Sequence, residues 1–260
     1  MTAIQSFREA IAQGRTLIGC GVTFVDPLVT DALASSADFI WLDLEHALMS
    51  PEAASAHLLA GRARDIPIIV RVPGGDTHTV KPVLDAGAEA VVIPQVRTLD
   101  EVRTFVADCL YPPEGVRGYG PRIPSNYGRQ GGASFAEEAN RTIMPTVMIE
   151  TREAFEQLDS ILAVPGLGAI MIGPTDLSWS LGLRGQTAHP DNLAAVQSIA
   201  QRTRAAGLPV GAGMGVEPDF AVTLAGLGVQ WLQVGADFGY LHHTLDSLTA
   251  RIRHELPPSG

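Results

Sequence analysis

Two acidic residues follow neighbouring apolar runs of the chain and could bind one cation together. Glu150 ends the run PTVMIE, and Asp176 lies three residues beyond the run GAIMIG. Carboxylates with no His or Cys beside them suit a hard cation such as Mg²⁺ or Mn²⁺, with water or substrate completing an octahedron. The alternative is structural, because Glu150 could cap the next helix and Asp176 could interact with a helix dipole. The spacing alone leaves both interpretations open.

Other polar residues also follow apolar runs. Arg71 ends the third run, where it could clamp a carboxylate or an enolate oxygen, or form an ion pair with a nearby acid. The second run ends in Asp43, Glu45 and His46, and His46 is a candidate acid or base. Asp85 is a further candidate, but it ends a helix pattern, so the alternative is that it is a solvated surface acid.

The elements that must position these residues are eight short, Val- and Ile-rich apolar runs, as expected of strands buried on both faces. They cover residues 17–22, 38–45, 66–72, 88–94, 145–150, 168–173, 208–213 and 231–235. Helix start signals lie between them, including Ser50-Pro51 and a capping box from Thr98 to Glu101. Eight β-then-α units predict a single (β/α)₈ TIM barrel over residues 1–260, with its chemistry at the C-terminal ends of the strands.

The composition excludes several classes of protein. The 260 residues carry 18 Lys+Arg against 28 Asp+Glu, a net charge of −10, and 46% of them are hydrophobic. This is too apolar for a disordered chain, and too acidic to favour nucleic acid or anionic membranes as partners. Two distant cysteines suggest a reducing compartment, and no apolar run or secretory signal predicts membrane insertion or export. We expect a cytoplasmic protein.

One segment departs from the alternating pattern. About 35 residues separate the helix ending near Cys109 from the strand at Thr146, and they begin YPPEGVRGYGPRIPSNYGRQGG. A loop this long in a compact domain is usually functional or covered by a partner.

Several motifs in sequence order resemble the HpcH/HpaI aldolase family, whose archetype is 4-hydroxy-2-oxoheptane-1,7-dioate aldolase. They are DFIWLDLEHALMS, IPIIVRVPG, LDAGAEAVVIPQVRTLDEVR, YPPEGVRGYGPR, MIETREAFEQLDSILAVPGLGAIMIGPTDLSWSLG and VGADFGYL. The similarity runs from about residue 15 to about residue 245. It implies a metal-dependent class II pyruvate aldolase that assembles as a hexamer, a trimer of dimers, with an exchanged C-terminal helix.

The resemblance also implies roles for individual residues. Glu150 and Asp176 match the ligands of a divalent metal, which could be Mg²⁺, Mn²⁺ or Co²⁺, and Arg71 matches the residue that holds the keto oxygen of pyruvate. The backbone N–H groups implied to bind the pyruvate carboxylate belong to the segment Gly173, Pro174 and Thr175.

The acid/base machinery implied by the resemblance is a dyad of His46 and Asp85 acting through water, with Asp43 in support. Two positions depart from the archetype: Met148 stands where it has Gln, and Gly21 stands where it has Trp. Both would line the site, so we expect a different aldehyde pocket.

The choice of catalytic route depends on one residue. Lys81 is the only lysine, and it lies in a helix pattern rather than at a strand end. A Schiff base is therefore disfavoured, and a metal is the expected electron sink for cleavage of a 4-hydroxy-2-oxo acid to pyruvate, or hydroxypyruvate, and an aldehyde. The alternatives are an acyl-CoA lyase of the citrate lyase β or malyl-CoA lyase type, and a non-catalytic 2-oxo-acid-binding barrel.

Overall fold

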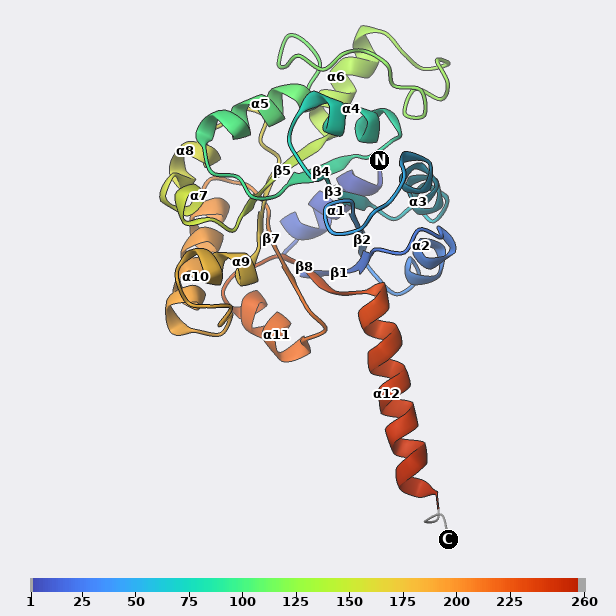
Figure 1. Ribbon diagram of the computed structural model, residues 1–260. Coiled ribbons are helices and arrows are strands. Elements are labelled where there is room, and N and C mark those ends of the chain that lie inside the picture. Colours follow the sequence, from blue (N-terminus) through green and yellow to red (C-terminus); the bar gives the residue numbers. More distant parts are fainter. Residues whose placement is uncertain (1, 257–260) are drawn as a thin grey trace.

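The computed structural model describes residues 2–256, in which eight parallel strands form a closed barrel (Figure 1). Each strand pairs with the next one, and β8 pairs with β1 to close the barrel. The strands are β1 (Leu17–Val22), β2 (Phe39–Asp43), β3 (Ile68–Arg71), β4 (Ala90–Ile93), β5 (Met144–Ile149), β6 (Ala169–Ile172), β7 (Val210–Met214) and β8 (Trp231–Ala236). Each predicted apolar run overlaps one strand, and the predicted (β/α)₈ fold is confirmed.

The helices lie around this barrel and at its ends. They are α1 (Ala3–Ala12), α2 (Leu28–Leu33), α3 (Pro51–Ala63), α4 (Thr77–Asp85), α5 (Leu99–Cys109), α6 (Ala133–Thr142), α7 (Arg152–Glu156), α8 (Leu158–Leu162), α9 (Pro174–Ser180), α10 (Pro190–Ala205), α11 (Pro218–Gly226) and α12 (Asp237–Glu255). The predicted caps are present, because the side chain of Ser50 accepts the N–H of Ala53 and that of Thr98 accepts the N–H of Glu101. The segment expected to be irregular contains α6, which no start signal had indicated.

Large apolar side chains fill the interior of the barrel and close one of its ends. Phe7 of α1 contacts Phe39 and Trp231 edge to face, with ring centroids 5.6 and 5.8 Å apart. These residues belong to one buried cluster with Trp41. Because α1 plugs the N-terminal ends of the strands, polar chemistry is confined to the opposite end, where the strands finish. We call that end the mouth.

Two interior glycines exist because of these rings. A Cβ atom on Gly19 of β1 would overlap the ring of Phe39, and one on Gly211 of β7 would overlap the ring of Trp231. Side chains alternate along a strand, so Gly21 and Gly213 face the same interior one layer nearer the mouth. Strands β1 and β7 therefore present backbone rather than side chains to that part of the barrel.

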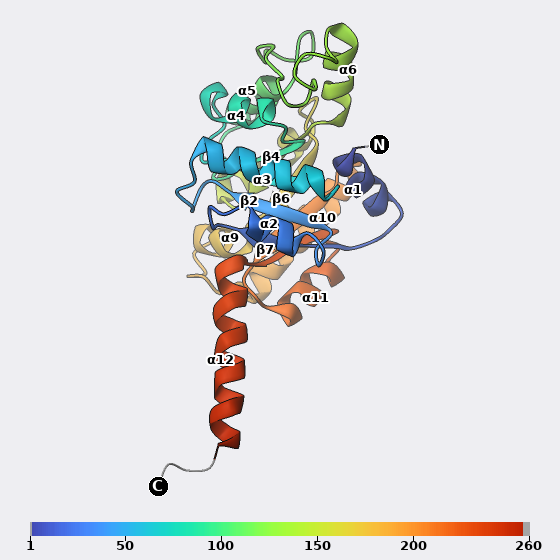
Figure 2. The same ribbon diagram turned by 90° about the vertical axis from the view of Figure 1, so that its right-hand side faces the viewer.

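The last helix, α12, projects away from the barrel in both views (Figures 1 and 2). Its apolar residues recur at intervals of three and four, which places them on one face, and they are 53–63% exposed. This face, which we call the α12 stripe, consists of Phe238, Leu241, Leu245, Leu248 and Ile252. Within residues 2–256, no helix has both the length and the apolar character needed to cross a membrane.

Candidate functional site

The carboxylate of Asp43 organises the polar side of the mouth. Asp43 ends β2 and is 5% exposed. One of its oxygens, Oδ1, accepts the backbone N–H groups of Glu45 and His46 at 3.0 and 3.2 Å. The same oxygen accepts Nε of Arg71 at 3.1 Å, and Oδ2 accepts Nη2 of Arg71 at 2.5 Å. A single buried carboxylate thus fixes both the turn that carries His46 and the guanidinium at the end of β3.

Arg71 is held by a second carboxylate as well. Its Nη1 lies 2.9 Å from Oε2 of Glu45, and its guanidinium carbon lies 5.5 Å from the ring centroid of Trp41. These contacts use three of the five N–H groups of the guanidinium, one on each nitrogen, and leave one on Nη1 and one on Nη2 for a ligand. The alternative predicted for Arg71, an ion pair with mouth acids, is therefore present, and it is compatible with a binding role.

Glu150 is a nearly buried carboxylate at the end of β5, with 2% exposure. Its Oε1 accepts the backbone N–H of Gln95 at 2.6 Å. A Cβ atom on Gly173, which follows β6, would overlap Oε2 of Glu150, so a glycine is needed at that position. Burial raises the pKa of Glu150 to about 7, the negative charges of Asp176 and Glu45 add to this increase, and the Gln95 N–H and Arg71 oppose it.

The charges at the mouth suit a cation. Asp176 lies in the first turn of α9, close enough for its charge to act on both Glu150 and Glu45. With Asp43 included, four carboxylates face the single guanidinium of Arg71. Burial also raises the pKa of Glu45, although Arg71 opposes that increase. Two carboxylates that leave other positions to water and substrate form the kind of site that Mg²⁺ occupies, so Glu150 and Asp176 fit a divalent cation.

A complete protein cage for a metal is not present in the described part of the chain. Among residues 2–256, no group of three or more His, Cys, Asp or Glu side chains is arranged to hold an ion.

The structural alternative for Glu150 was that it caps the next helix. This does not apply, because its carboxylate accepts the N–H of Gln95 on another loop and the cap of α7 is Thr151.

The segment after β6 offers fewer donors than the resemblance implies. Pro174 has no N–H, and the N–H of Gly173 donates to the carbonyl of Ile149 at 3.3 Å. Thr175 is exposed in the first turn of α9, where backbone N–H groups have no partner within the helix. Of the three predicted residues, Thr175 is thus the one whose N–H can bind a substrate carboxylate.

His46 lies on the segment between β2 and α3, and its side chain is 66% exposed. Its Nε2 is 3.7 Å from Oε2 of Glu45, and its backbone is fixed by Asp43. The ring is therefore presented at the mouth by an anchored backbone while its own nitrogens remain open to a substrate or to water.

Asp85 does not join His46 within one chain. It ends α4, which runs back from the mouth towards the start of β4, and its carboxylate bonds Nζ of Lys81 and Nη2 of Arg117, each at 2.8 Å. Gly118 and Gly120 allow the long segment to pack against this pair, since added Cβ atoms would lie 3.1 Å from Lys81 Cε and from Asp85 Oδ2. The RGYG sequence thus holds Asp85 at a distance from the mouth.

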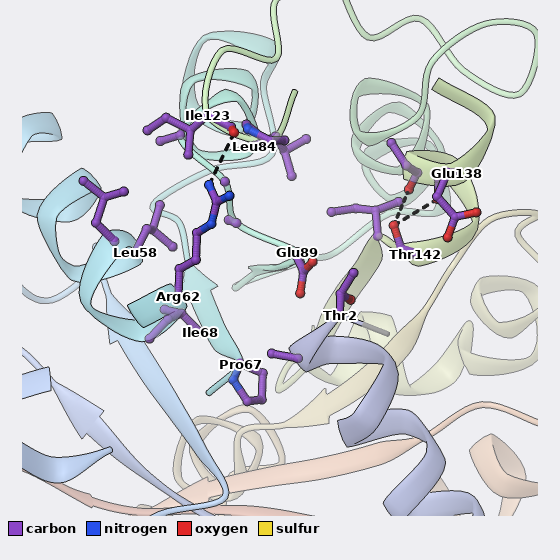
Figure 3. Close-up of a pocket in the computed structure, with 18 of the residues that line it drawn as sticks. Thr2, Leu58, Arg62, Pro67, Ile68, Leu84, Glu89, Ile123, Glu138 and Thr142 are labelled. Atoms are coloured by element: carbon purple, nitrogen blue, oxygen red, sulfur yellow. Dashed lines mark hydrogen bonds between the residues drawn. The ribbon is translucent and has the colours of Figure 1, made fainter. Parts of the chain in front are cut away.

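A cavity of about 440 Å³ lies beside this region rather than at the mouth (Figure 3). Its lining comes from the starts of β3 and α1, from α3 and α6, and from the long segment, and it includes Arg62 and Glu89. None of the predicted site residues lines it. The acids and the guanidinium are all at the mouth, so the chemistry, rather than the size of a cavity, identifies the candidate site.

Several contributors had no assigned role at the level of sequence. Glu45 was visible as a polar residue after the second run, and Arg117 lies within the recognised YPP-x-G-x-RG motif. Gln95 contributes a backbone N–H, a group that every residue except proline has, so the residue type could not indicate this contact. Asp237, at the start of α12, accepts the N–H groups of Thr23 and Phe24 at 2.8 Å each and so anchors the segment after β1.

Comparisons with known proteins agree on one family. Residues 24–244 match the family described as HpcH/HpaI aldolase/citrate lyase. A 4-hydroxy-2-oxovalerate aldolase of Rhodococcus jostii is 36% identical over 250 residues, covering 95% of this chain and 96% of that protein. A hydroxypyruvate/pyruvate aldolase of Roseobacter denitrificans is 31% identical over 251 residues, covering 95% and 97%.

Solved structures agree as well. The crystal structure of an HpcH/HpaI aldolase from Desulfitobacterium hafniense is similar, with a TM-score of 0.89 and 28% sequence identity. The match covers 97% of this chain and 98% of that one.

The buried charge of Glu150 predicts how the cation-free protein responds to pH. Its pKa is raised from the ordinary 4.5 to about 7, so its contribution to stability is complete below about pH 4.5 and is lost as the pH rises through 7. We expect wild type in chelator to lose about 3 kcal/mol of unfolding free energy over this range relative to Glu150→Gln. Urea titrations at several pH values measure this difference. Glu137→Gln on exposed α6 is the control, and a parallel response of all three proteins would contradict the prediction.

Proposed function

The chain belongs to the HpcH/HpaI aldolase/citrate lyase family, and we propose that it is a metal-dependent aldolase with Glu150 and Asp176 as its metal ligands. Relatives named aldolases match it over nearly its whole length, so it is a carbon–carbon lyase. The observation that carries the metal assignment is the buried carboxylate of Glu150, which lies near Asp176 and forms no salt bridge with a basic side chain of residues 2–256.

The proposed substrates are 4-hydroxy-2-oxo acids. One relative is named for 4-hydroxy-2-oxovalerate and another for hydroxypyruvate and pyruvate, so the common element is a short 2-oxo acid. Cleavage breaks the C3–C4 bond, and the electron pair of that bond forms the enolate of the 2-oxo acid. The hydroxyl at C4 loses its proton and becomes the carbonyl of the aldehyde.

The residues of the mouth suit the carboxylate of this substrate and the negative charge that develops on its keto oxygen during cleavage. A divalent cation held by Glu150 and Asp176 would supply a Lewis acid for the keto oxygen. Arg71 donates its two remaining N–H groups to the same oxygen and stabilises the negative charge that develops there. The N–H of Thr175 binds the carboxylate. Because Asp43 and Glu45 hold the guanidinium in advance, little reorganisation is needed when that charge forms.

His46 is the proposed base for the C4 hydroxyl. Its exposed ring nitrogens and anchored backbone suit proton transfer to and from a substrate. The proposed dyad with Asp85 requires the Asp85 of a second copy, because within one chain α4 carries Asp85 away from the mouth. Asp85 is already oriented by Lys81 and Arg117, so a neighbouring copy would offer it in a fixed position.

Lys81 is not the nucleophile in this proposal. It lies in α4, and its amine pairs with Asp85 at 2.8 Å and is thereby directed away from the mouth. The acidic balance of the chain, 18 Lys+Arg against 28 Asp+Glu with a single lysine, weighs against a CoA-dependent lyase, which needs basic residues for the CoA phosphates.

The protein is proposed to be a homo-oligomer, most simply the hexamer that the resemblance implies. The α12 stripe supports this, because five large apolar side chains more than half exposed on a projecting helix form a patch that isolated chains rarely tolerate. A helix that leaves its own barrel suits exchange with a neighbouring copy.

Metal dependence predicts a specific pattern of loss and recovery. We expect chelator to abolish aldol activity, and Mg²⁺, Mn²⁺ or Co²⁺ to restore it and to raise the thermal midpoint of wild type. Glu150→Gln should show neither recovery nor the thermal shift, since one of its two ligands is neutral. Borohydride with pyruvate should leave the protein mass unchanged. Full activity in Glu150→Gln, or an adduct on Lys81, would contradict the assignment.

Removal of His46 or Arg71 should separate two half-reactions. His46→Ala is expected to lose aldol cleavage by about 10²–10⁴-fold while retaining part of the exchange of pyruvate methyl protons with D₂O. Arg71→Ala should lose both about equally, because it removes charge stabilisation common to both. Proton NMR in D₂O and a coupled cleavage assay measure the two rates. Cleavage at the wild-type rate in His46→Ala would mean that another group takes the proton.

The oligomer should depend on the α12 stripe. We expect the double variant Leu245→Glu and Leu248→Glu to lower the mass measured by light scattering at micromolar concentration, because buried charges destabilise an apolar contact. Ser247→Glu with Ala250→Glu adds the same charges to other positions of the helix and serves as the control. A wild-type monomer, or a double variant of unchanged mass, would refute the role of the stripe.

A further inference from the structure

We propose that Gln233 selects the aldehyde half of the substrate by hydrogen bonding to a hydroxyl group on it. This assignment rests on the proposed aldolase function and extends it to the part of the substrate that the charged residues do not reach. The protein would accordingly favour aldehydes that carry a hydroxyl beside the carbonyl over alkyl aldehydes of the same size.

Gln233 points into the barrel on the mouth side of the apolar interior. Trp231, two residues earlier on β8, belongs to the interior cluster, and alternation directs Gln233 to the same face one layer higher. Its neighbours agree with this orientation. A Cβ atom on Gly213 would lie 2.9 Å from Oε1 of Gln233, and one on Gly21 would lie 3.1 Å from Nε2.

The mouth therefore has two unlike sectors. Strands β2, β3 and β5, together with the start of α9, form what we call the charged sector, and they supply Asp43, Arg71, Glu150, Thr175 and Asp176. Strands β7, β8 and β1, which we call the glycine-lined sector, place Gly213 and Gly21 beside Gln233, whereas Gly235 lies at a β-bulge, where an added Cβ atom would meet Val216 and Tyr240 instead. Apart from the indole N–H of the fully buried Trp231, the polar side chains on these three strands are Cys20 and Gln233, and Cys20 packs in the outer core.

A substrate held at its 2-oxo acid end would extend from the charged sector towards this glycine-lined sector, because the charged sector is occupied by the groups that bind the carboxylate and the keto oxygen. Gly21 and Gly213 have no side chains, and the amide of Gln233 lies directly over both of them. That amide is therefore the polar group that the remaining atoms of the substrate would meet there. Gln233 is partly exposed, so a ligand can reach it.

The hydrogen bonds of Gln233 indicate what it can bind. Its Nε2 donates to the carbonyl of Gly235. Among residues 2–256, no donor hydrogen bonds to its Oε1. The amide therefore offers one acceptor and one further N–H, a combination that a hydroxyl satisfies because it both donates and accepts. A carboxylate would face the lone pairs of Oε1, and an alkyl chain would leave the amide without a partner.

The test compares two aldehydes that differ by one group. Glycolaldehyde and propanal are nearly the same size, with a hydroxyl in one where the other has a methyl group. We would measure kcat/KM for condensation of pyruvate with each, using wild type, Gln233→Met and the control Gln13→Met at the exposed end of α1. The two aldehydes differ in hydration and in intrinsic reactivity, but these differences are the same for every protein. They therefore cancel when the glycolaldehyde-to-propanal ratio of a variant is compared with that of wild type.

We expect Gln233→Met to lower the glycolaldehyde-to-propanal ratio by about tenfold, as for the loss of one buried hydrogen bond, and Gln13→Met to keep the wild-type ratio. A ratio in Gln233→Met within twofold of wild type would overturn the assignment. Exchange of pyruvate methyl protons in D₂O reports whether the site is formed, and Gln233→Ala replaces Gln233→Met if that exchange is lost. Wild type that catalyses neither exchange nor condensation would overturn the proposed function itself.

Discussion

The carboxylate of Asp43 is the contact on which the rest of the mouth depends. It joins the end of β2 to the end of β3 through Arg71, and it fixes the turn that carries His46. A carboxylate that accepts four hydrogen bonds is strongly held, so each partner inherits its position. Arg71 is consequently part of the scaffold and part of the proposed binding surface at once. Any shift of β2 against β3 would move the guanidinium and the histidine together.

This arrangement concentrates negative charge where the fold can least accommodate it. Glu150 is almost fully buried, and burial of a carboxylate costs free energy unless a cation or hydrogen bonds offset it. One backbone N–H from Gln95 and a distant guanidinium offset only part of that cost, as the raised pKa indicates. The remaining imbalance is what a divalent cation would remove. Burial of Glu150 thus lowers the stability of the cation-free protein, and the proposed divalent cation would serve both stability and function.

Much of the barrel follows from local pattern, whereas the details of the site do not. The apolar runs overlap the strands because strands buried on both faces need continuous apolar sequence. Glu150 and Arg71 could be singled out because barrel chemistry lies at strand ends. The clamp of Glu45 on Arg71 depends on side-chain directions across two strands, and the Gln95 contact depends on a backbone N–H. Neither leaves a signature in the residue type.

Asp85 illustrates a different limit of sequence-based prediction. Its motif indicates a catalytic role, whereas its position at the end of a helix indicates a surface acid. The two interpretations agree if the Asp85 of a second copy completes the site. Lys81, Arg117 and the close-packed glycines hold the carboxylate in one orientation, although none of the described mouth residues forms a hydrogen bond or a salt bridge with it. These contacts orient a residue that lies far from the mouth of its own barrel, which is expected if its carboxylate acts at the mouth of a neighbouring copy.

The division of the mouth into a charged and a glycine-lined sector suggests how one chemistry can serve several aldehydes. In the proposed reaction, the charged sector handles the atoms that every 4-hydroxy-2-oxo acid shares, so the reaction constrains its residues. The glycine-lined sector would contact only the variable part of the substrate, and a change there would alter the fit without moving the clamp on Arg71. Gly19 and Gly211 keep β1 and β7 close to the interior rings, so this sector rests on a rigid base. Selectivity can therefore change at Gln233 and its neighbours while the chemistry stays with the residues anchored by Asp43.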